Sequence, residues 1–273
     1  MAMLDIASAG LSDIGRKRHS NQDYFLIDDA HRLYLVADGM GGHQAGEVAS
    51  QLVVDSIRQY FSASAPDRDT TETAQQDPFL SPEANRLREA ISYANQQVYQ
   101  AGEGNKAYKG MGSTVAAVQF IKNTFIAANV GDSPIYLIHE KSIETLSVPH
   151  TLMAEQQDFS PEDQALFGPD LQHMLTRGMG VDDTVKPDIC ESPCFNGDRL
   201  VICSDGLSGK VAPEEILDVV SSESTPDACQ TLVDMANQRG GDDNITVVVL
   251  HVIAQNTLFQ RLSHWIAHFI TRP

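Results

Sequence analysis

The chain has 273 residues, of which 42% are hydrophobic, so it can bury a sizeable core in one large domain. Its formal net charge is -18, and it has no basic stripe of the kind that binds nucleic acid or an anionic membrane, so neither partner is expected. A strongly acidic protein can act on an anionic substrate only where something local reverses the field, and bound divalent cations are the usual means.

The cysteines and the apolar runs indicate the compartment. The four cysteines lack the paired spacing of a disulfide framework or a zinc site, which suits a reducing environment. The N-terminal residues do not have the pattern of a signal peptide, and no apolar run approaches the roughly 20 residues that span a bilayer. We therefore expect a soluble, cytoplasmic protein.

The first half of the chain alternates strand and helix patterns. The run RLYLVADGMGGH (32–43) predicts a strand that ends in an Asp-Gly pair. Apolar residues at helical spacing predict a helix over residues 44–61 and a second helix around residues 87–98, and we expect the two to pack together. The polar stretch 62–84 between them contains three prolines and predicts an irregular surface insertion.

The middle of the chain changes to a strand pattern. Residues 113–140 contain three strand-like runs joined by short turns, which predict one antiparallel meander, and we expect Ser113 and Thr114 to serve strand packing. Residues 150–180 have a mixed pattern that predicts a helical excursion with a helix start at Ser160.

The last part of the chain again separates strands from helices. A strand over residues 198–205 leads into a helix opened by Pro213, and Thr225 opens a further helix. The run 244–253 closes the sheet region. Because strands and helices stand in separate blocks without strict alternation, the sequence predicts an α+β fold with antiparallel sheets.

Three aspartates share one setting. Asp38, Asp205 and Asp243 each lie at the edge of an apolar strand, in a stretch that contains glycine. Carboxylates placed together repel one another, and Mg²⁺ or Mn²⁺ removes that repulsion because these ions prefer oxygen ligands. Gly39 has no Cβ and can turn its carbonyl oxygen toward an ion. The alternative is that each Asp-Gly pair is only a turn, but two such pairs together with GGDDNIT (240–246) favour a metal site.

Six segments closely resemble the ordered motifs of the metal-dependent protein phosphatases of type 2C, in their bacterial form. The segments are GRKRHSNQD (15–23), VADGMGGHQAGEVAS (36–50), MGSTVAAV (111–118), ANVGDSPIYLI (128–138), CSDGLSG (203–209) and GGDDNITVVVL (240–250). The resemblance covers roughly residues 8–253 and implies a catalytic domain over residues 1–254. It also implies a four-layer α-β-β-α sandwich, two antiparallel sheets flanked by helices, that hydrolyses phosphoserine and phosphothreonine on proteins.

The resemblance assigns the metal ligands residue by residue. It implies that Asp38 bridges two ions, Mn²⁺ or Mg²⁺, that Gly39 offers a carbonyl oxygen, and that Asp205 and Asp243 complete the set. Asp132 resembles the ligand of a third, weaker ion in bacterial relatives. The family's reaction then uses a metal-activated water that attacks phosphorus in line, without a phosphoenzyme.

Further residues are assigned around these ligands. Arg18 lies at the family's phosphate-binding position and acts with Asp38 in catalysis; the alternative is a surface arginine in the basic run RKRH (16–19). Asp23 resembles a carboxylate that holds metal-bound water, and Asn244 follows the ligand Asp243 beside the metals. The preceding Asp242 is expected to be a solvated neighbour.

The sequence departs from the family pattern at several positions. Gln22 stands where many relatives have Glu, and Pro134 where many have Arg. Met40 occupies the place of a histidine proposed as general acid in eukaryotic members, and Met cannot donate a proton. His43 is nearby, but a helix-capping or surface role fits it at least as well. We expect His150 to be only a loop residue.

The C-terminal tail, residues 255–273, predicts an amphipathic helix that packs on its own domain or docks on a partner or membrane surface. We expect the protein to act on phosphorylated proteins, opposing a bacterial serine/threonine kinase in signalling. Two rivals stay open: a member of the same fold that binds phosphoproteins without hydrolysing them, and a phosphatase restricted to one regulatory switch protein.

Overall fold

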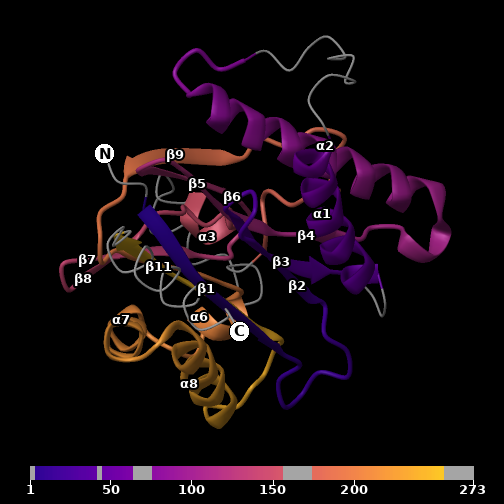
Figure 1. Ribbon diagram of the computed structural model, residues 1–273. Helices are drawn as coiled ribbons and strands as arrows, with labels where there is room; N and C mark the ends of the chain where they lie inside the picture. The colour runs from indigo at the N-terminus through magenta and orange to yellow at the C-terminus, as the bar shows by residue number, and fades with distance from the viewer. Residues whose placement is uncertain (1–3, 42–44, 64–75, 156–173, 255–273) are drawn as a thin grey trace, which may run out of the picture.

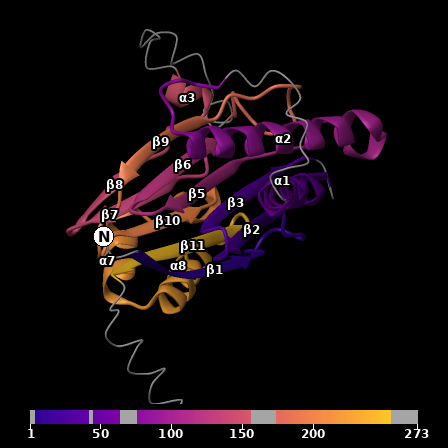
Figure 2. The same cartoon turned by 45° about the horizontal axis from the view of Figure 1, so that its top comes forward.

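Two antiparallel sheets lie face to face, with helices covering both outer sides (Figure 1). The computed structural model describes residues 4–41, 45–63, 76–155 and 174–254. Figure 2 shows α1 and α2 on one side of the sheets and α7 and α8 on the other. The predicted α+β class and the four-layer sandwich are therefore confirmed.

Each sheet combines strands from distant parts of the chain. The first sheet contains, in spatial order, β1 (Leu4–Asp13), β11 (Ile245–Ala254), β10 (Arg199–Cys203), β7 (Ile135–His139) and β8 (Ser142–Thr145). The second sheet contains β2 (Asp23–Asp28), β3 (Leu33–Met40), β5 (Val115–Ile121), β6 (Thr124–Val130) and β9 (Asp188–Pro193), while β4 (Gly112–Ser113) pairs with the end of β3.

The four long helices that the sequence predicted are confirmed. They are α1 (Ala45–Ser62) and α2 (Pro82–Gly104), which pack on each other and on the second sheet, and α7 (Pro213–Ser222) and α8 (Thr225–Gln238), which cover the first sheet. Three short elements complete the helices of the described residues: η1 (Lys106–Tyr108), α3 (Leu152–Glu155) and α6 (Asp205–Ser208). At the start of α2, the Ser81 hydroxyl accepts from the backbone N of Ala84 at 3.1 Å.

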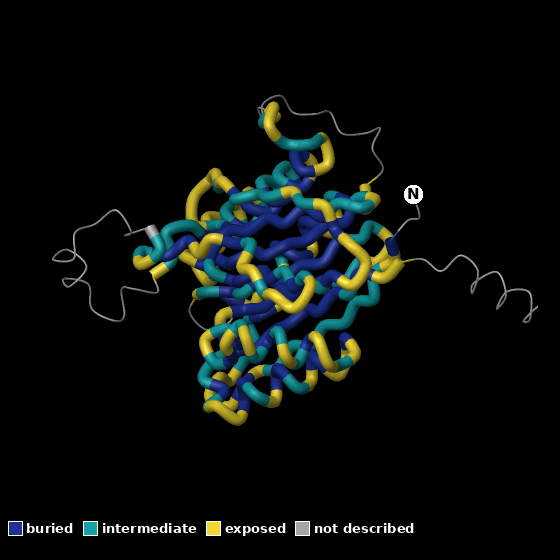
Figure 3. The backbone as a smooth tube through the Cα atoms, turned by 90° about the vertical axis from the view of Figure 1, so that its left-hand side faces the viewer, coloured by how far each residue is buried: buried dark blue, intermediate teal, exposed yellow. Residues whose placement is uncertain are grey.

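Side-chain alternation along the strands builds three hydrophobic cores. In β3, Leu33 and Leu35 face α1 and α2, whereas Tyr34 and Val36 face the first sheet. Strand β11 alternates in the same way, between the core under α7 and α8 and the core between the sheets. The strands are consequently the most buried part of the chain (Figure 3).

The predicted meander over residues 113–140 is wrong. Strands β5 and β6 pair in the second sheet, but β7 lies in the first sheet, where it pairs with β8 and β10. Gly131 has a φ of 101°, which glycine adopts without a Cβ penalty, and it turns the chain out of the second sheet instead of closing a hairpin. Residues 131–134 therefore form a crossover between the sheets.

Besides the two-residue β4, four strands escaped prediction: β1, β2, β8 and β9. Strand β1 pairs with β11 along its whole length, and β9 pairs with β6. The segments LDIASAGLSD and DICESP contain many small or polar residues, so their strand state is decided by pairing in the folded protein and not by local propensity.

Four predictions fall outside the described residues: the role of His43, the middle of the insertion (64–75), the helix start at Ser160 and the tail (255–273). The domain boundary after residue 254 stays a prediction. Among the helices of the described residues, none is both long enough and apolar enough to cross a membrane.

Candidate functional site

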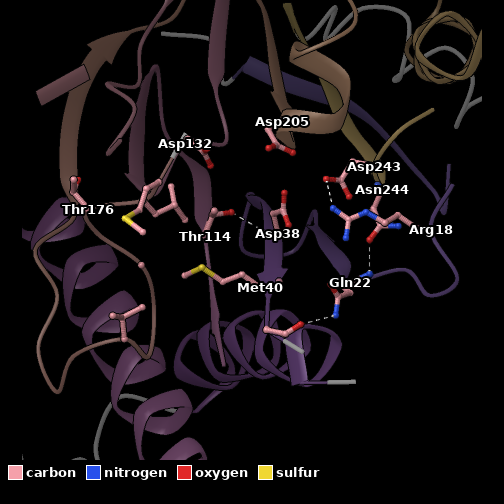
Figure 4. A pocket seen from close by; sticks show the side chains of 16 residues that line it. Arg18, Gln22, Asp38, Met40, Thr114, Asp132, Thr176, Asp205, Asp243 and Asn244 are labelled. Atoms are coloured by element: carbon pink, nitrogen blue, oxygen red, sulfur yellow. Dashed lines mark hydrogen bonds and ion pairs between the residues drawn. The ribbon is translucent and has the colours of Figure 1, made fainter. Parts of the chain in front are cut away.

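A cavity of about 470 Å³ opens where β3 and β10 end and β11 begins. It collects side chains that are far apart in the sequence (Figure 4). Every predicted site residue except Asp23 lines it: Arg18, Asp38, Gly39, Asp132, Asp205, Asp243 and Asn244.

The position of Asp38 follows from the alternation of β3. Tyr34 and Val36 belong to the core between the sheets, and Asp38 is the next residue on the same face. Asp23 lies opposite Asp38 in the neighbouring strand β2 and is 5% exposed. The alternation therefore places a pair of carboxylates at the edge of the inter-sheet core.

Hydroxyl groups hold the backbone around Asp38. The backbone N of Asp38 donates to Thr114 Oγ1 at 3.0 Å, and the Ser113 hydroxyl donates to the Asp38 carbonyl at 2.9 Å. The backbone N of Thr114 also donates to that carbonyl, at 2.8 Å. These two residues thus fix the position of Asp38, a role beyond the strand packing that we predicted.

Gly39 lies where β3 meets the start of α1. A Cβ at this position would lie 2.0 Å from the carbonyl oxygen of Gly46 and 2.6 Å from that of Gln22. Its backbone N donates to the Gln22 carbonyl at 3.0 Å. Only glycine allows this approach, which sets the segment before β2 against the residue after Asp38.

Asp205 and Asp243 come from two segments that touch. Asp205 is the first residue of α6, two residues after the end of β10, and Asp243 lies two residues before β11. A Cβ on Gly206 would lie 2.0 Å from the carbonyl oxygen of Asn244, so the backbones are in contact. Arg18 Nη2 donates to Asp243 Oδ2 at 2.6 Å, which brings the guanidinium beside the carboxylates.

Asn244 fixes the loop that carries Arg18. Its Oδ1 accepts from the backbone N of Gln22 at 2.8 Å. Its Nδ2 donates to the carbonyls of Ile14 at 2.9 Å and Ser20 at 3.0 Å. The buried side-chain amide of Asn244 therefore holds the loop both before Arg18, at Ile14, and after it, at Ser20 and Gln22.

The electrostatics of the site favour bound cations. Burial raises the pKa of Asp38 well above its usual range, and the charges of Asp23 and Asp205 raise it further. Burial also raises the pKa of Asp23, to about 6. The carboxylate of Asp205 is open to water within the cavity, yet burial by the surrounding protein and the charge of Asp243 raise its pKa. Positive charge beside these groups therefore favours their joint ionisation.

The residues present fit divalent cations by donor chemistry. The cavity offers carboxylate oxygens, the donors that Mg²⁺ and Mn²⁺ prefer. The Oδ1 atom of Asp23 is buried without a hydrogen-bond partner, so it can accept a further hydrogen bond. In the part of the chain that the structure describes, no group of three or more His, Cys, Asp or Glu side chains already stands in position to hold an ion.

Asp132 lies in the crossover between β6 and β7, on the opposite side of Asp38 from Arg18 (Figure 4). The next residue, Ser133, shares a hydrogen bond of 2.7 Å with Thr114. Because Thr114 also accepts from the backbone N of Asp38, one hydroxyl ties both carboxylate-bearing segments together.

His150 is a buried connection and not the plain loop residue that we predicted. It is 0% exposed, and its Nδ1 accepts from the backbone N of Gly131 at 3.1 Å. This leaves Nε2 protonated, and Nε2 lies 3.1 Å from Asp188 Oδ2. Arg177 Nη1 donates to Asp188 Oδ1 at 2.9 Å. His150 thus connects the crossover to β9 and to the segment of Arg177.

Asp242 is the solvated neighbour that we predicted, because its side chain is 42% exposed and does not line the cavity. It forms ion pairs with Lys17 and Lys210. The hydrogen bond from Lys17, followed by that from Lys210, lowers the pKa of Asp242 to about 2. His43, the alternative proton donor near Met40, lies outside the described residues.

Sequence reasoning missed Ser204. Its hydroxyl donates to Asp23 Oδ2 at 2.7 Å and accepts from the backbone N of Thr246 at 3.0 Å. Leu200 and Ile202 face the core between the sheets, and Ser204 continues their period of two. This alternation in the sequence could have predicted that Ser204 faces the core between the sheets.

Known proteins match the chain along most of its length. The family model described as protein phosphatase 2C matches residues 10–248. A Streptococcus pyogenes protein named putative protein phosphatase 2C-type is 35% identical over 246 residues, which cover 88% of this chain and 95% of the relative. A protein of Listeria welshimeri named serine/threonine phosphatase stp is 33% identical over 246 residues, which cover 88% and 93%. The solved catalytic domain of the serine/threonine protein phosphatase PstP, in complex with two manganese ions, superposes with a TM-score of 0.75 at 29% identity, covering 92% of this chain and 99% of that one.

Proposed function

Because the chain belongs to the protein phosphatase 2C family and is a metal-dependent protein serine/threonine phosphatase, we propose that the cavity around Asp38 is its catalytic site. The observation that carries the proposal is the convergence of three carboxylates, from Asp38, Asp205 and Asp243, with the Arg18 guanidinium at one cavity. A carboxylate cluster that favours bound cations, beside a donor for phosphate oxygens, suits phosphate ester hydrolysis.

Asp38, Gly39, Asp205 and Asp243 would hold two divalent cations, Mn²⁺ or Mg²⁺. The two manganese ions of PstP and the oxygen donors of this cavity support this assignment. When bound, the cations supply the charge that lets the carboxylates ionise together, and they activate a water for attack on phosphorus. Asp132, on the other side of Asp38, would help to hold a third and weaker ion.

Arg18 would bind and orient the phosphate. A planar guanidinium donates to two phosphate oxygens at once, and Asn244 already fixes the loop from which Arg18 extends. The side chain is 49% exposed, so it can turn from Asp243 toward an incoming phosphate. Met40 lines the same cavity but has no proton to give to the leaving hydroxyl.

The substrates are phosphorylated serine and threonine side chains of proteins. We place the chain opposite a bacterial serine/threonine kinase in a cytoplasmic signalling pathway, and its four unpaired cysteines suit that compartment. Phosphoproteomics of cells with and without the protein distinguishes a broad antagonist of a kinase from a phosphatase of one switch protein. A single phosphoprotein that accumulates would favour the latter.

The direct test is hydrolysis of para-nitrophenyl phosphate and of a phosphothreonine peptide by the purified chain. Both should require added Mn²⁺ or Mg²⁺ and stop with EDTA. Asp38→Asn should abolish most turnover, whereas Asp55→Asn, at an exposed position of α1 outside the cavity, should retain it. Turnover that persists in EDTA would refute the assignment.

A further inference from the structure

The cavity has a second side that is uncharged apart from Asp132, and the proposed chemistry does not use its uncharged residues. Arg18 and Asp243 lie on one side of Asp38, and Met40 and Thr176 lie away from them (Figure 4). This second side also contains apolar residues that line the cavity: Met174, Leu175 and Val181. Two of these are large and open to solvent, with Met174 54% and Val181 55% exposed.

Two glycines make room for this apolar surface. A Cβ on Gly112 would lie 2.7 Å from Met40 Cε, and a Cβ on Gly178 would lie 2.5 Å from the same atom. The same two positions approach Val181 Cγ2, at 3.3 Å and 3.1 Å. Met40 and Val181 therefore lie against the same pair of glycines and form one continuous apolar wall.

A buried asparagine of α2 holds the backbone on both sides of Val181. Asn95 is 0% exposed; its Oδ1 accepts from the backbone N of Gly180 at 2.7 Å, and its Nδ2 donates to the carbonyl of Asp182 at 3.0 Å. Gly180 has a φ of 78°, and a Cβ there would lie 2.2 Å from Val98 Cγ1. Val181 is thus exposed to solvent but firmly positioned.

The wall is also tied to Asp38. Ser113 and Met179 exchange two backbone hydrogen bonds, of 3.1 Å and 2.7 Å. The Ser113 hydroxyl donates to the Asp38 carbonyl at 2.9 Å. The apolar wall consequently keeps a fixed distance from the carboxylate cluster.

We propose that Met40, Met174 and Val181 form a subsite for an apolar side chain next to the phosphorylated residue of the substrate, and that Asn95 positions it. This inference rests on the proposed function. A phosphorylated side chain that reaches Asp38 brings its neighbours in the chain past the wall, because both belong to one cavity. An apolar neighbouring residue of the substrate would cover the exposed apolar wall and remove it from water. An acidic neighbouring residue would be repelled by the carboxylates on the other side of the cavity.

The test uses phosphothreonine peptides that differ only in the residues on either side of the phosphothreonine, which are Leu, Gly or Asp. Wild type should show kcat/KM for the Leu peptides about three- to tenfold above the Gly peptides, with the Asp peptides lowest. Val181→Ser should remove the preference for Leu by lowering kcat/KM for the Leu peptides, with a much smaller effect on the Gly peptides. Val148→Ser is the matched control, because Val148 is 59% exposed and does not line the cavity.

Asn95→Ala tests the positioning role. It should reduce the Leu preference by raising KM for the Leu peptides, with little change in kcat for para-nitrophenyl phosphate. A merely structural role would lower turnover of all substrates alike, and that result would overturn the role of Asn95.

Equal kcat/KM for the Leu and Gly peptides with wild type, or an equal loss on every substrate in Val181→Ser, would overturn the subsite. If wild type hydrolyses none of the substrates, the proposed function fails. The subsite is then decided by calorimetric affinities of the same peptides for wild type, in which the Leu peptides must bind more tightly than the Gly peptides.

Discussion

The two sides of the cavity are built in different ways. The carboxylates of Asp38, Asp205 and Asp243 sit next to the ends of β3, β10 and β11, strands that belong to the buried centre of the molecule (Figure 3). Arg18 and Val181 of the apolar wall come from loops that the side chains of Asn244 and Asn95 attach to the sandwich, whereas Met40 of that wall is the last residue of β3. Paired strands thus hold the groups that repel one another, and loops carry most of the groups that meet the substrate.

Because the two sides are built differently, substitutions on them should affect different properties of the protein. The strand side retains electrostatic repulsion, which burial makes worse and which only the folded sheets can contain. The loop side has little repulsion, but its geometry depends on a few hydrogen bonds. Substitutions on the strand side should therefore impair the chemistry without weakening the fold, and substitutions on the loop side should impair binding.

The largest effect is expected for Asp38→Asn. Turnover of para-nitrophenyl phosphate should fall by about 10³-fold or more, because the bridging position serves both ions. The free energy of unfolding measured in EDTA at neutral pH should rise, since one carboxylate is removed from among Asp23, Asp205 and Asp243. Urea unfolding beside steady-state kinetics checks both, and a variant that keeps most activity would show that another carboxylate is central.

The second largest effect is expected for Asn244→Ala, which should lower turnover of para-nitrophenyl phosphate by about 10- to 100-fold. Here stability should fall too, by about 1–3 kcal/mol, because the carbonyls of Ile14 and Ser20 lose their donor. Asn85→Ala is the matched control: Asn85 is buried and holds residues 77–81, and it does not line the cavity. If the control loses as much activity as Asn244→Ala, the effect is a general one of stability.

The carboxylates could be predicted from sequence because each follows or precedes a continuous apolar strand, a local signal. The crossover at Gly131 could not, because the choice between a hairpin and a change of sheet depends on β7 pairing with β8 and β10. The same reason explains the missed strands β1 and β9. Asn95 gave a weak signal, as a polar residue on an otherwise apolar helix face, but its partners at Gly180 and Asp182 are 85 and 87 residues away.

Arg18→Ala should mainly raise KM for small phosphate esters, by about tenfold, with a smaller loss in kcat. The unfolding free energy should change by less than about 0.5 kcal/mol, because the ion pair with Asp243 is half exposed. Lys17→Ala, at the neighbouring exposed position, should leave KM unchanged. Combined with Asn244→Ala, the Arg18 substitution should add little further loss, since Asn244 acts through the same loop. An unchanged KM in Arg18→Ala would support the alternative that Arg18 is only a surface arginine.

The smallest effect is expected for Asp132→Ala, which removes a carboxylate from the crossover loop on the side of Asp38 opposite Arg18 in Figure 4. The crossover should survive, because Ser133 and Gly131 keep their hydrogen bonds to Thr114 and His150. A single carboxylate holds an ion weakly, so turnover on phosphopeptides should fall about two- to tenfold and the Mn²⁺ needed for full rate should rise. Calorimetric Mn²⁺ titration should still show the tight sites; their loss would place Asp132 among the tight ligands, and an unchanged Mn²⁺ dependence would leave it a turn residue.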